Sequence, residues 1–521
     1  MDTLLNRFST KVNSVITGFD RIVFKGIVRP IVHSDGMESF LRARKVLNKD
    51  FKSYVVAQSQ AIVSAAEQTA KEQSGHGIVY IPSLNERKEA LAKKRQEETG
   101  IKEGLIGVWS CVESCHTFKS KFDKTKTYPS LSFEHSKCKH LYYYFDDPVY
   151  GSMSVRLQTW APYEIQVALN GREWLKRSLD AASCGYMAKG NKFLHIDDYG
   201  LAQGLLDEQA GTDFGRVLNG FLPTVFPVMP EVLGKGLSYY WTVWQSEIAK
   251  DYIFNDSKTL AALMDDFQLH AMITGNGERI MKYFGSPTRA DGRPFKDKDP
   301  EILSRTKNWY DGMRVRHWNG SNSVKLYNEH NVLRFEMTMN DPSRFKIYRN
   351  TENQYEGDPK KFLQMRKSVL DMEDRANVSK TIIDRFTENM AGVKEQTRLG
   401  AMLDFVETPL VEEGKRTRAI DVFGKDREFL RAISDPALDI HAITNKQLQG
   451  ILEGTPWAKN MTGRQLSSRI TRHLALLRKH RLIEQLPKQR KYVLTDMGRR
   501  ITAALNISLA ASVDDLLNLA A

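Results

Sequence analysis

SNSVKLYNEHNVLRFEMT, residues Ser321 to Thr338, contains two runs in which apolar and polar residues alternate, on either side of the polar pair Glu329-His330. Strict alternation around a short polar break is typical of a tight antiparallel hairpin. With Asn328 opposite Asn331, every second side chain points to the same face. The apolar face then holds Val324, Leu326, Leu333 and Phe335.

The other face of this hairpin holds polar side chains with complementary chemistry. Phosphodiester chemistry needs a nucleophile, cations that offset the phosphate oxygens, and hard carboxylate ligands for a metal ion. Tyr327 is the candidate nucleophile, Lys325 and Arg334 are the candidate catalytic cations, and Glu336 supplies a carboxylate. The alternative is that Tyr327 is an ordinary sheet tyrosine and that Arg334 and Glu336 form an ordinary polar face.

Length and composition indicate a globular protein of several domains. The 521 residues are 41% hydrophobic and 27% charged, and no apolar run approaches the roughly 20 residues that cross a bilayer. The first residues lack the layout of a secretory signal, and four cysteines are too few for a disulfide scaffold. We therefore expect a cytoplasmic protein without a membrane partner.

Positive charge is concentrated near the carboxyl end. The chain has a net charge of +13, and residues 461–500 hold eleven Lys or Arg against two acidic residues, or +9. Such a cluster favours nucleic acid as a partner. No Gly-x4-Gly-Lys-Ser phosphate loop and no Gly-x-Ser-x-Gly elbow occur, so the sequence argues against an ATP-driven motor and a serine hydrolase.

The pattern of apolar residues predicts an α+β fold: a mixed or antiparallel sheet core with helical insertions. We expect a core over residues 1–355, in which 197–290 is mainly helical, a helical connector over 356–430, a nucleic-acid-binding domain over 431–507 and a tail over 508–521. The core is the possible nicking domain, and a homodimer is a possible assembly.

The predicted order of elements over residues 440–505 is helix, helix, strand, basic turn, strand and helix. This order resembles the winged helix, a helix-turn-helix with a β-hairpin wing. Leu466, Ile470, Leu474 and Leu477 form an apolar stripe at helical spacing. The resemblance implies that a recognition helix and a wing bind nucleic acid, DNA rather than RNA. The expected contact residues are Arg464, Arg469, Arg472, Arg478, Lys479, Lys488, Arg490 and Lys491. Packing of the wing on a protein partner is the alternative.

The hairpin, in the form WNGSNSVKLYNEHNVLRFEMT, resembles a segment of the rolling-circle replication initiators of plasmids and filamentous phages. GFDRIVFKG, residues 18–26, resembles their first strand. The resemblance implies a nicking fold in which Asp20 and Glu336 hold Mg or Mn and Tyr327 attacks the phosphate. The segment MSVRLQTWAPYEIQVALNGREWL instead resembles a widespread set of uncharacterised bacterial proteins and implies no activity.

Two further groups of residues have a chemical interpretation. Cys111, Cys115, Cys138 and His140 offer four soft ligands for zinc, although their spacing fits no common finger and buried thiols are the simpler account. Arg156 and Trp160 alternate on one strand, and with Tyr142 and Tyr144 they offer a basic and aromatic surface to unpaired bases. A sheet face covered by another domain explains this second group equally well.

The sequence thus predicts a nucleic-acid-binding protein of the replication-initiator or transposase type. In this hypothesis it is a metal-dependent DNA-nicking endonuclease, or transesterase, that acts through Tyr327. The alternative is a non-enzymatic DNA- or RNA-binding protein, either a transcription regulator or the protein component of a ribonucleoprotein.

Overall fold

The computed structural model describes residues 2–82, 87–122, 128–285, 301–351, 360–393, 399–412, 415–435, 438, 442–486 and 489–512. The chain forms two compact units, and each unit combines segments that are far apart in the sequence. Unit 1 consists of residues 1–13, 255–328 and 381–521, and unit 2 consists of residues 14–254 and 329–380. The domains expected from the sequence, by contrast, were each one continuous segment of the chain.

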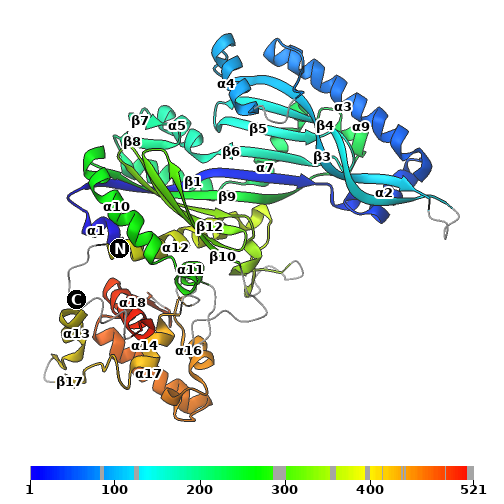
Figure 1. Ribbon diagram of the computed structural model, residues 1–521. Helices are drawn as coiled ribbons and strands as arrows, with labels where there is room; N and C mark the ends of the chain where they lie inside the picture. The colour runs from blue at the N-terminus through cyan, green and yellow to red at the C-terminus, as the bar shows by residue number, and fades with distance from the viewer. Residues whose placement is uncertain are drawn as a thin grey trace. The chain divides into compact units, whose positions relative to one another are not determined.

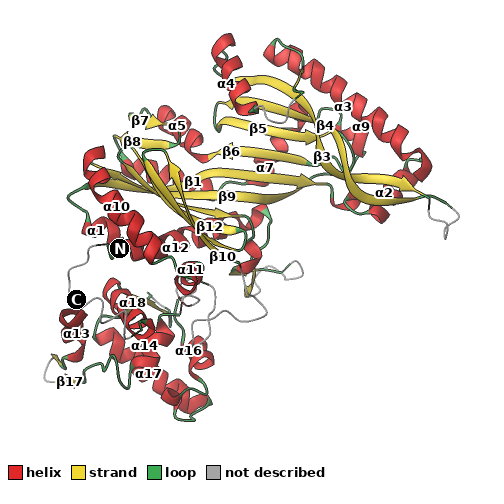
Figure 2. Ribbon diagram, in the orientation of Figure 1, coloured by secondary structure: helices red, strands yellow, loops and turns green. Residues whose placement is uncertain are grey.

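Unit 2 is built on a long sheet. The largest sheet of the protein has eleven strands, and unit 2 holds eight consecutive ones in the order β13-β9-β1-β6-β5-β4-β3-β2. Neighbouring strands are antiparallel in the pairs β13–β9, β1–β6, β6–β5, β5–β4 and β4–β3, whereas β2 and β3 are parallel. The strands of unit 2 (Figures 1 and 2) are β1 (Val12–Ile27), β2 (Val79–Tyr80), β3 (Gly104–Lys121), β4 (Ser130–Asp147), β5 (Gly151–Gln158), β6 (Ile165–Asn170), β7 (Tyr186–Lys189), β8 (Lys192–Ile196), β9 (Tyr240–Phe254), β13 (Val332–Met339), β14 (Lys346–Arg349) and β15 (Lys361–Gln364).

Helices pack on this sheet, and their apolar residues bury one of its faces. The apolar residues Ile16 of β1, Ile253 of β9 and Val332 of β13 form one buried cluster with Leu175 and Leu206 of the helices α5 and α6. The helices of unit 2 are α2 (Ser34–Ala43), α3 (Phe51–Ser74), α4 (Lys88–Thr99), α5 (Gly171–Ala181), α6 (Tyr199–Ala210), α7 (Phe214–Gly220), α8 (Leu222–Val225) and α9 (Met229–Leu233). Helix α12 (Met372–Ala391) contains the division between units 2 and 1 after residue 380.

One part of the predicted helical region is a strand. The described part of residues 197–290 contains the helices α6 to α9, α10 (Ser257–Ile273) and α11 (Gly277–Tyr283), in agreement with a mainly helical segment. However, Tyr240–Phe254 forms the 15-residue strand β9, which the pattern did not predict. The stretch YWTVWQSEIAKDYIF is rich in aromatic and β-branched residues, which favour strands. All its residues from Ile248 to Phe254 are buried, and burial on both faces hides the alternation that reveals a half-exposed strand.

Unit 1 contains the first strand of the predicted hairpin. Its strands β10 (Ile302–Trp309), β11 (Gly312–Asn319) and β12 (Asn322–Glu329) follow one another in the largest sheet. Strand β13 begins three residues after β12 ends, and His330 between them has a φ of 52°, so the predicted strands and tight break are present. The helices in the first two segments of unit 1 are α1 (Thr3–Arg7), α10 (Ser257–Ile273) and α11 (Gly277–Tyr283).

The carboxyl-terminal part of unit 1 has a hydrophobic core of its own. Residues Leu466, Ile470, Leu474 and Leu477 are all buried in this core, as the apolar stripe predicted. The observed elements are α13 (Leu399–Glu407), β16 (Leu410–Glu412), β17 (Lys415–Thr417), α14 (Arg427–Ile433), α16 (Asn445–Leu452), α17 (Gly463–Lys479), β18 (Ile483–Gln485), β19 (Tyr492–Leu494) and α18 (Asp496–Ala510). From α16 onward their order is the predicted one.

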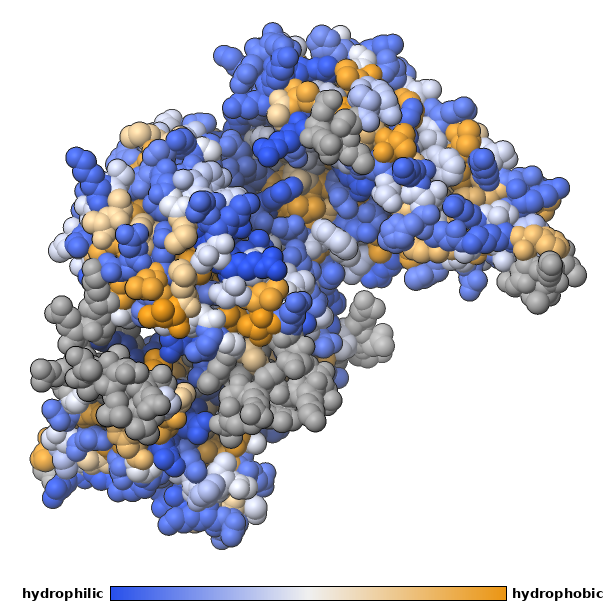
Figure 3. Space-filling view, viewed as in Figure 1, coloured by the Kyte–Doolittle hydropathy of each residue, from blue (hydrophilic) through white to orange (hydrophobic). Residues whose placement is uncertain are grey.

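The fold is therefore mixed, with one large mixed sheet and many helices, in agreement with the α+β expectation. Among the described residues, none of the helices combines the length and the apolar character that a membrane span requires. Hydrophilic residues predominate on the face drawn in Figure 3, and hydrophobic residues form small separate groups there.

Candidate functional site

Three neighbouring strands of unit 2 bring three carboxylates together. In the β13–β9 register Arg334 is opposite Asp251, Glu336 is opposite Ala249 and Thr338 is opposite Glu247. Strand β1, the next neighbour of β9, supplies Asp20. One oxygen from each of Asp20, Glu247 and Glu336 lies within 4.8 Å of the others. This spacing suits a single hard cation, which prefers carboxylate oxygens.

The three acids differ in their exposure to solvent. Glu336 is 2% exposed and Asp20 is 8% exposed, whereas Glu247 is half-buried. Strand alternation explains why they share a face with the buried residues Ile16, Ile253 and Val332, because all these residues are an even number of positions apart on their strands. The site therefore lies on the sheet face that the apolar residues of α5 and α6 cover.

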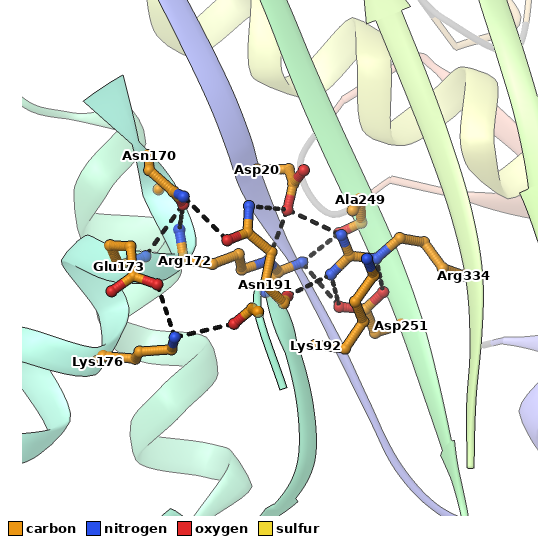
Figure 4. A network of polar contacts seen from close by, with 12 residues as sticks. Asp20, Asn170, Arg172, Glu173, Lys176, Asn191, Lys192, Ala249, Asp251 and Arg334 are labelled. Atoms are coloured by element: carbon orange, nitrogen blue, oxygen red, sulfur yellow. Dashed lines mark hydrogen bonds and ion pairs between the residues drawn. The ribbon is translucent and has the colours of Figure 1, made fainter. Parts of the chain in front are cut away.

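Arg334 connects two buried acids of this face (Figure 4). Its Nε and Nη2 atoms donate to the two carboxylate oxygens of Asp251 at 2.6 and 2.7 Å, and its Nη1 atom donates to Oδ1 of Asp20 at 2.8 Å. The backbone oxygen of Asn191 accepts a further bond at 2.7 Å. The guanidinium is 1% exposed, so its two acids hold it inside the protein.

A second arginine enters the network from helix α5. Arg172 is fully buried, its Nη2 atom donates to the backbone oxygen of Ala249 at 2.8 Å, and the same atom lies 3.2 Å from Oδ2 of Asp251. The local sequence fixes its position: Asn170 caps α5 by accepting bonds from the backbone nitrogens of Arg172 and Glu173. An Asn cap supplies bonds that the first turn of a helix otherwise lacks. The cap therefore aims the first turn of α5 at the acids (Figure 4).

The network keeps Asp20 ionised. Burial raises the pKa of Asp20, but the charges of Arg334, Arg172 and Lys192 and a hydrogen bond from Asn191 outweigh it, so the pKa lies below its ordinary value. Nδ2 of Asn191 donates to Oδ1 of Asp20 at 3.1 Å. A carboxylate that is ionised and fixed in position is prepared to bind a cation without reorganising.

The fold brings together Asp20 and Glu336, the two acids that the sequence predicted as metal ligands, and their role as ligands stays a prediction. The sequence missed Glu247 and Asp251, because both lie on the strand that the pattern presented as helical, and it missed Arg172 and Asn191. A signal for β9 was present in its aromatic and β-branched content. No local signal marks Arg172, whose role arises from tertiary packing.

The candidate nucleophile belongs to unit 1. Tyr327 is 4% exposed, and its ring centroid is 6.3 Å from that of Trp309 and 6.0 Å from that of Tyr310. The Nζ atom of Lys325 lies 6.0 Å from the centroid of the Tyr327 ring, and Lys325 is half-buried. The lysine and the tyrosine are thus neighbours on β12, as expected.

Three of the four candidate zinc ligands make side-chain contacts that the structure describes. Sγ of Cys111 donates to Oε1 of Glu113 at 3.1 Å, and Sγ of Cys138 lies 3.9 Å from Nδ1 of His140. Burial lowers the pKa of His140 to about 4. In the part of the chain that the structure describes, the group with converging metal-ligand atoms is the acidic one, Asp20, Glu247 and Glu336. Zinc bound by Cys111, Cys115, Cys138 and His140 stays a prediction.

The basic and aromatic surface expected around Arg156 is occupied by internal contacts. The Arg156 guanidinium lies 3.2 Å from Glu113 and donates to the Tyr142 hydroxyl at 3.0 Å. Lys88 approaches the same carboxylate at 3.0 Å. Burial raises the pKa of Glu113. Hydrogen bonds from Tyr142, Cys111 and Lys88 and the charge of Arg156 lower the pKa by more than burial raises it, so the pKa is about 2. These contacts leave Arg156 and Tyr142 poorly placed to stack with bases.

Helix α17 separates an apolar face from a basic one. Its four apolar stripe residues are buried, whereas Arg464, Ser468, Arg472 and Lys479 are exposed, as the helical spacing predicts. Arg478 donates to Gln485 at 2.9 Å and Lys479 to Thr417 at 3.2 Å, so each of these exposed side chains has an internal bond.

The other predicted contact residues have mixed positions. Arg469 is half-buried, and its guanidinium lies 4.4 Å from the ring centroid of Trp457, which indicates a structural role. Arg490 is exposed and Lys491 is half-buried in the turn before β19, and Lys488 lies outside the described residues. The exposed members of the predicted set therefore lie on α17 and at the turn between β18 and β19.

Comparison of the chain with protein-family models, with curated proteins and with solved structures finds no match.

Proposed function

We propose that this protein binds nucleic acid through its carboxyl-terminal module, residues 431–507, acting as a winged helix. The observation that supports this best is helix α17, whose buried leucine stripe fixes the helix while its exposed cations face away from the core. A recognition helix needs this division, because one face must set its pose while the other enters the major groove. DNA is the proposed partner.

The binding proposal is tested with the double variant Arg472→Ala/Arg478→Ala of the full chain and a labelled duplex. Each lost phosphate contact reduces the salt dependence of the binding constant, so two lost contacts flatten the log–log slope by about 2. The matched control is Lys94→Ala/Lys425→Ala, which removes two exposed cations outside α17. Equal binding by the two double variants in anisotropy titrations would refute a role for α17.

We further propose that unit 2 contains a divalent-metal centre for strand cleavage, as in replication initiators and transposases. The convergence of Asp20, Glu247 and Glu336 supports it. Mg or Mn there would offset the charge of the phosphate oxygens. Arg334 and Arg172 act in this proposal as positioning residues, because their bonds go to Asp20, Asp251 and backbone oxygens inside the protein.

Tyr327 is the proposed nucleophile and Lys325 its neighbouring cation. The phenolic oxygen would lose its proton and form a bond to phosphorus, while the bond from phosphorus to one sugar oxygen breaks and that oxygen takes up a proton. Supercoiled DNA with Mn or Mg is then expected to yield nicked circles and a covalent protein–DNA adduct. Tyr327→Phe should abolish both, and Glu336→Gln should abolish both without reducing duplex binding.

The outcomes separate the proposals. An adduct that persists in Tyr327→Phe assigns the nucleophile to another residue. Nicked circles without an adduct, unchanged in Tyr327→Phe, indicate a metal-dependent nuclease that uses water. Shifted but intact DNA with Mn and with Mg would refute cleavage and favour the non-enzymatic binding protein.

A further inference from the structure

Strands β10, β11 and β12 place five cations in cross-strand register. Arg305 is opposite Arg316, which is in turn opposite Lys325, and Lys307 is opposite Arg314. All five side chains share one face of these strands because they occupy alternate positions. Arg305 and Lys307 are exposed, and the other three are half-buried.

Such pairing is costly for the fold. Like charges directly opposite one another on a sheet destabilise it. The alternate positions 303–309, 312–318 and 323–327 that share this face contain no aspartate or glutamate. The face therefore gathers positive charge without acids of its own, which is the charge pattern that complements a polyanion.

The opposite face of the same strands explains the stability of the arrangement. Val315, His317, Val324 and Leu326 are fully buried there. Tyr283 of α11 lies against His317, and Gln268 of α10 donates to the backbone oxygen of Met313 at 3.3 Å. Burial on this side therefore holds the three strands, and with them the cationic face, in place.

Aromatic rings lie between the cations. The guanidinium of Arg316 is 4.6 Å from the ring centroid of Trp318, and that of Arg314 is 4.4 Å from the centroid of Trp309. Tyr310, in the turn after β10, is 59% exposed, and its ring contacts Trp309 with centroids 5.1 Å apart. Rings and guanidinium planes next to phosphate-binding cations are what unpaired bases stack on.

We propose that this basic–aromatic face binds a single-stranded nucleic acid, with phosphates on Arg305 and Lys307 and bases on Tyr310 and Trp318. The face is four residues long and three strands wide, so it measures roughly 13 by 10 Å. This area is comparable to that of the sheet surfaces on which RNA-binding domains stack two or three bases. This inference rests on the proposed nucleic-acid function and names a second, strand-selective site. A duplex has no unstacked bases to offer, and an acidic peptide has no bases.

The test uses the full-length protein and a fluorescein-labelled 15-nucleotide oligo-dT in anisotropy titrations at two salt concentrations. Arg305→Glu/Lys307→Glu is expected to weaken oligo-dT binding by at least about tenfold and to flatten the log–log salt slope by about 1.4, for two lost phosphate contacts. The matched control Lys93→Glu/Lys94→Glu reverses two exposed cations on α4 and should bind normally. Equal weakening by both double variants would overturn the proposal.

The stacking component has its own variant. Tyr310 has a φ of 43°, so Tyr310→Asn removes the ring while keeping a residue that tolerates left-handed backbone. Binding of oligo-dT should weaken by about 5- to 150-fold, which corresponds to the loss of one stacked base. Unchanged affinity, or competition by poly-glutamate as strong as that by unlabelled oligo-dT, would overturn the proposed role of the bases.

A 15-base-pair duplex distinguishes this site from the proposed function. Arg305→Glu/Lys307→Glu should leave duplex binding unchanged, whereas Arg472→Ala/Arg478→Ala should weaken it. If the wild type binds the duplex but not oligo-dT, the inferred site is wrong and the α17 proposal stands. If the wild type binds neither, both are wrong.

Discussion

Arg334 shows how a residue's surroundings decide its role. The sequence presents it beside a tyrosine and a glutamate, as a cation for a phosphate, but the fold gives its donors to Asp251 and Asp20 inside unit 2. Its place on the polar face of the hairpin could be predicted from the sequence, but its partners could not, because Asp251 lies on β9, 83 residues away. Long-range ion pairs leave no periodic trace in a sequence.

The buried guanidinium gives a stability prediction. Arg334→Met should lower the free energy of unfolding by about 3–5 kcal/mol, because it leaves the carboxylate of Asp251 buried without this partner. Arg344→Met is the control, since Arg344 pairs with Asp341 near the surface at 3.8 Å. Urea titrations measure both, and a loss below about 1 kcal/mol for Arg334→Met would contradict the buried-pair account.

Glu113 gives a prediction for acid pH. Its pKa is lowered to about 2 in the folded chain from an ordinary value of 4.5, so its stabilising contribution is present above pH 4.5 and is lost as the pH falls towards 2. Glu113→Gln should therefore lower the free energy of unfolding near neutral pH. The difference in this free energy between the variant and the wild type, measured by urea titration, should become smaller as the pH falls from 5 to 2. Glu97→Gln, on exposed α4, is the control. If the difference in the free energy of unfolding stays the same from pH 5 to pH 2, the lowered pKa of Glu113 does not contribute to stability as proposed.

At the scale of elements, the junction between β6 and α5 sets the direction of the helix that supplies Arg172. A Cβ atom at Gly171 would lie 2.3 Å from the backbone oxygen of Phe19, so the helix approaches β1 as closely as a glycine allows. The closeness brings Arg172 to Asp251 of the central strands.

Gly171→Ala is accordingly expected to destabilise the protein by about 1–3 kcal/mol, because the junction must shift to relieve the overlap. Gly220→Ala at the end of α7 provides the comparison, since a Cβ atom there meets nothing within 4 Å. Thermal unfolding measures both. Equal melting temperatures for Gly171→Ala and Gly220→Ala would show that the backbone at the junction can move at little cost in stability.

The elements also show where sequence patterns inform and where they fail. Helix α17 and strands β12 and β13 were predictable, because each has one face of uniform character with a clear period of 3.6 or 2. Strand β9 was not, because apolar and polar residues do not alternate along YWTVWQSEIAKDYIF, and the charged Glu247, Lys250 and Asp251 break any apolar run. The missed acids of the site are on that strand.

For the molecule as a whole, the proposed metal centre would link cation binding to the free energy of unfolding. A cation that binds the folded site alone stabilises the protein by about 2.7 kcal/mol at a hundredfold excess over its Kd. Mn should therefore raise the melting temperature of the transition that includes unit 2, and Glu247→Gln should reduce this rise. Glu98→Gln, on exposed α4, should behave as the wild type. A rise of the same size in Glu247→Gln would contradict the proposed centre.

The interleaving of the two units along the chain sets an order for folding during translation. Unit 2 is fully synthesised once residue 380 has left the ribosome, whereas residues 1–13 and 255–328 belong to a unit whose last segment begins at residue 381. At about 5–20 residues per second, synthesis of residues 381–521 then takes roughly 7–28 seconds. Throughout that interval the early parts of unit 1 await their partners, so messages truncated near codon 380 should give chains that depend on chaperones.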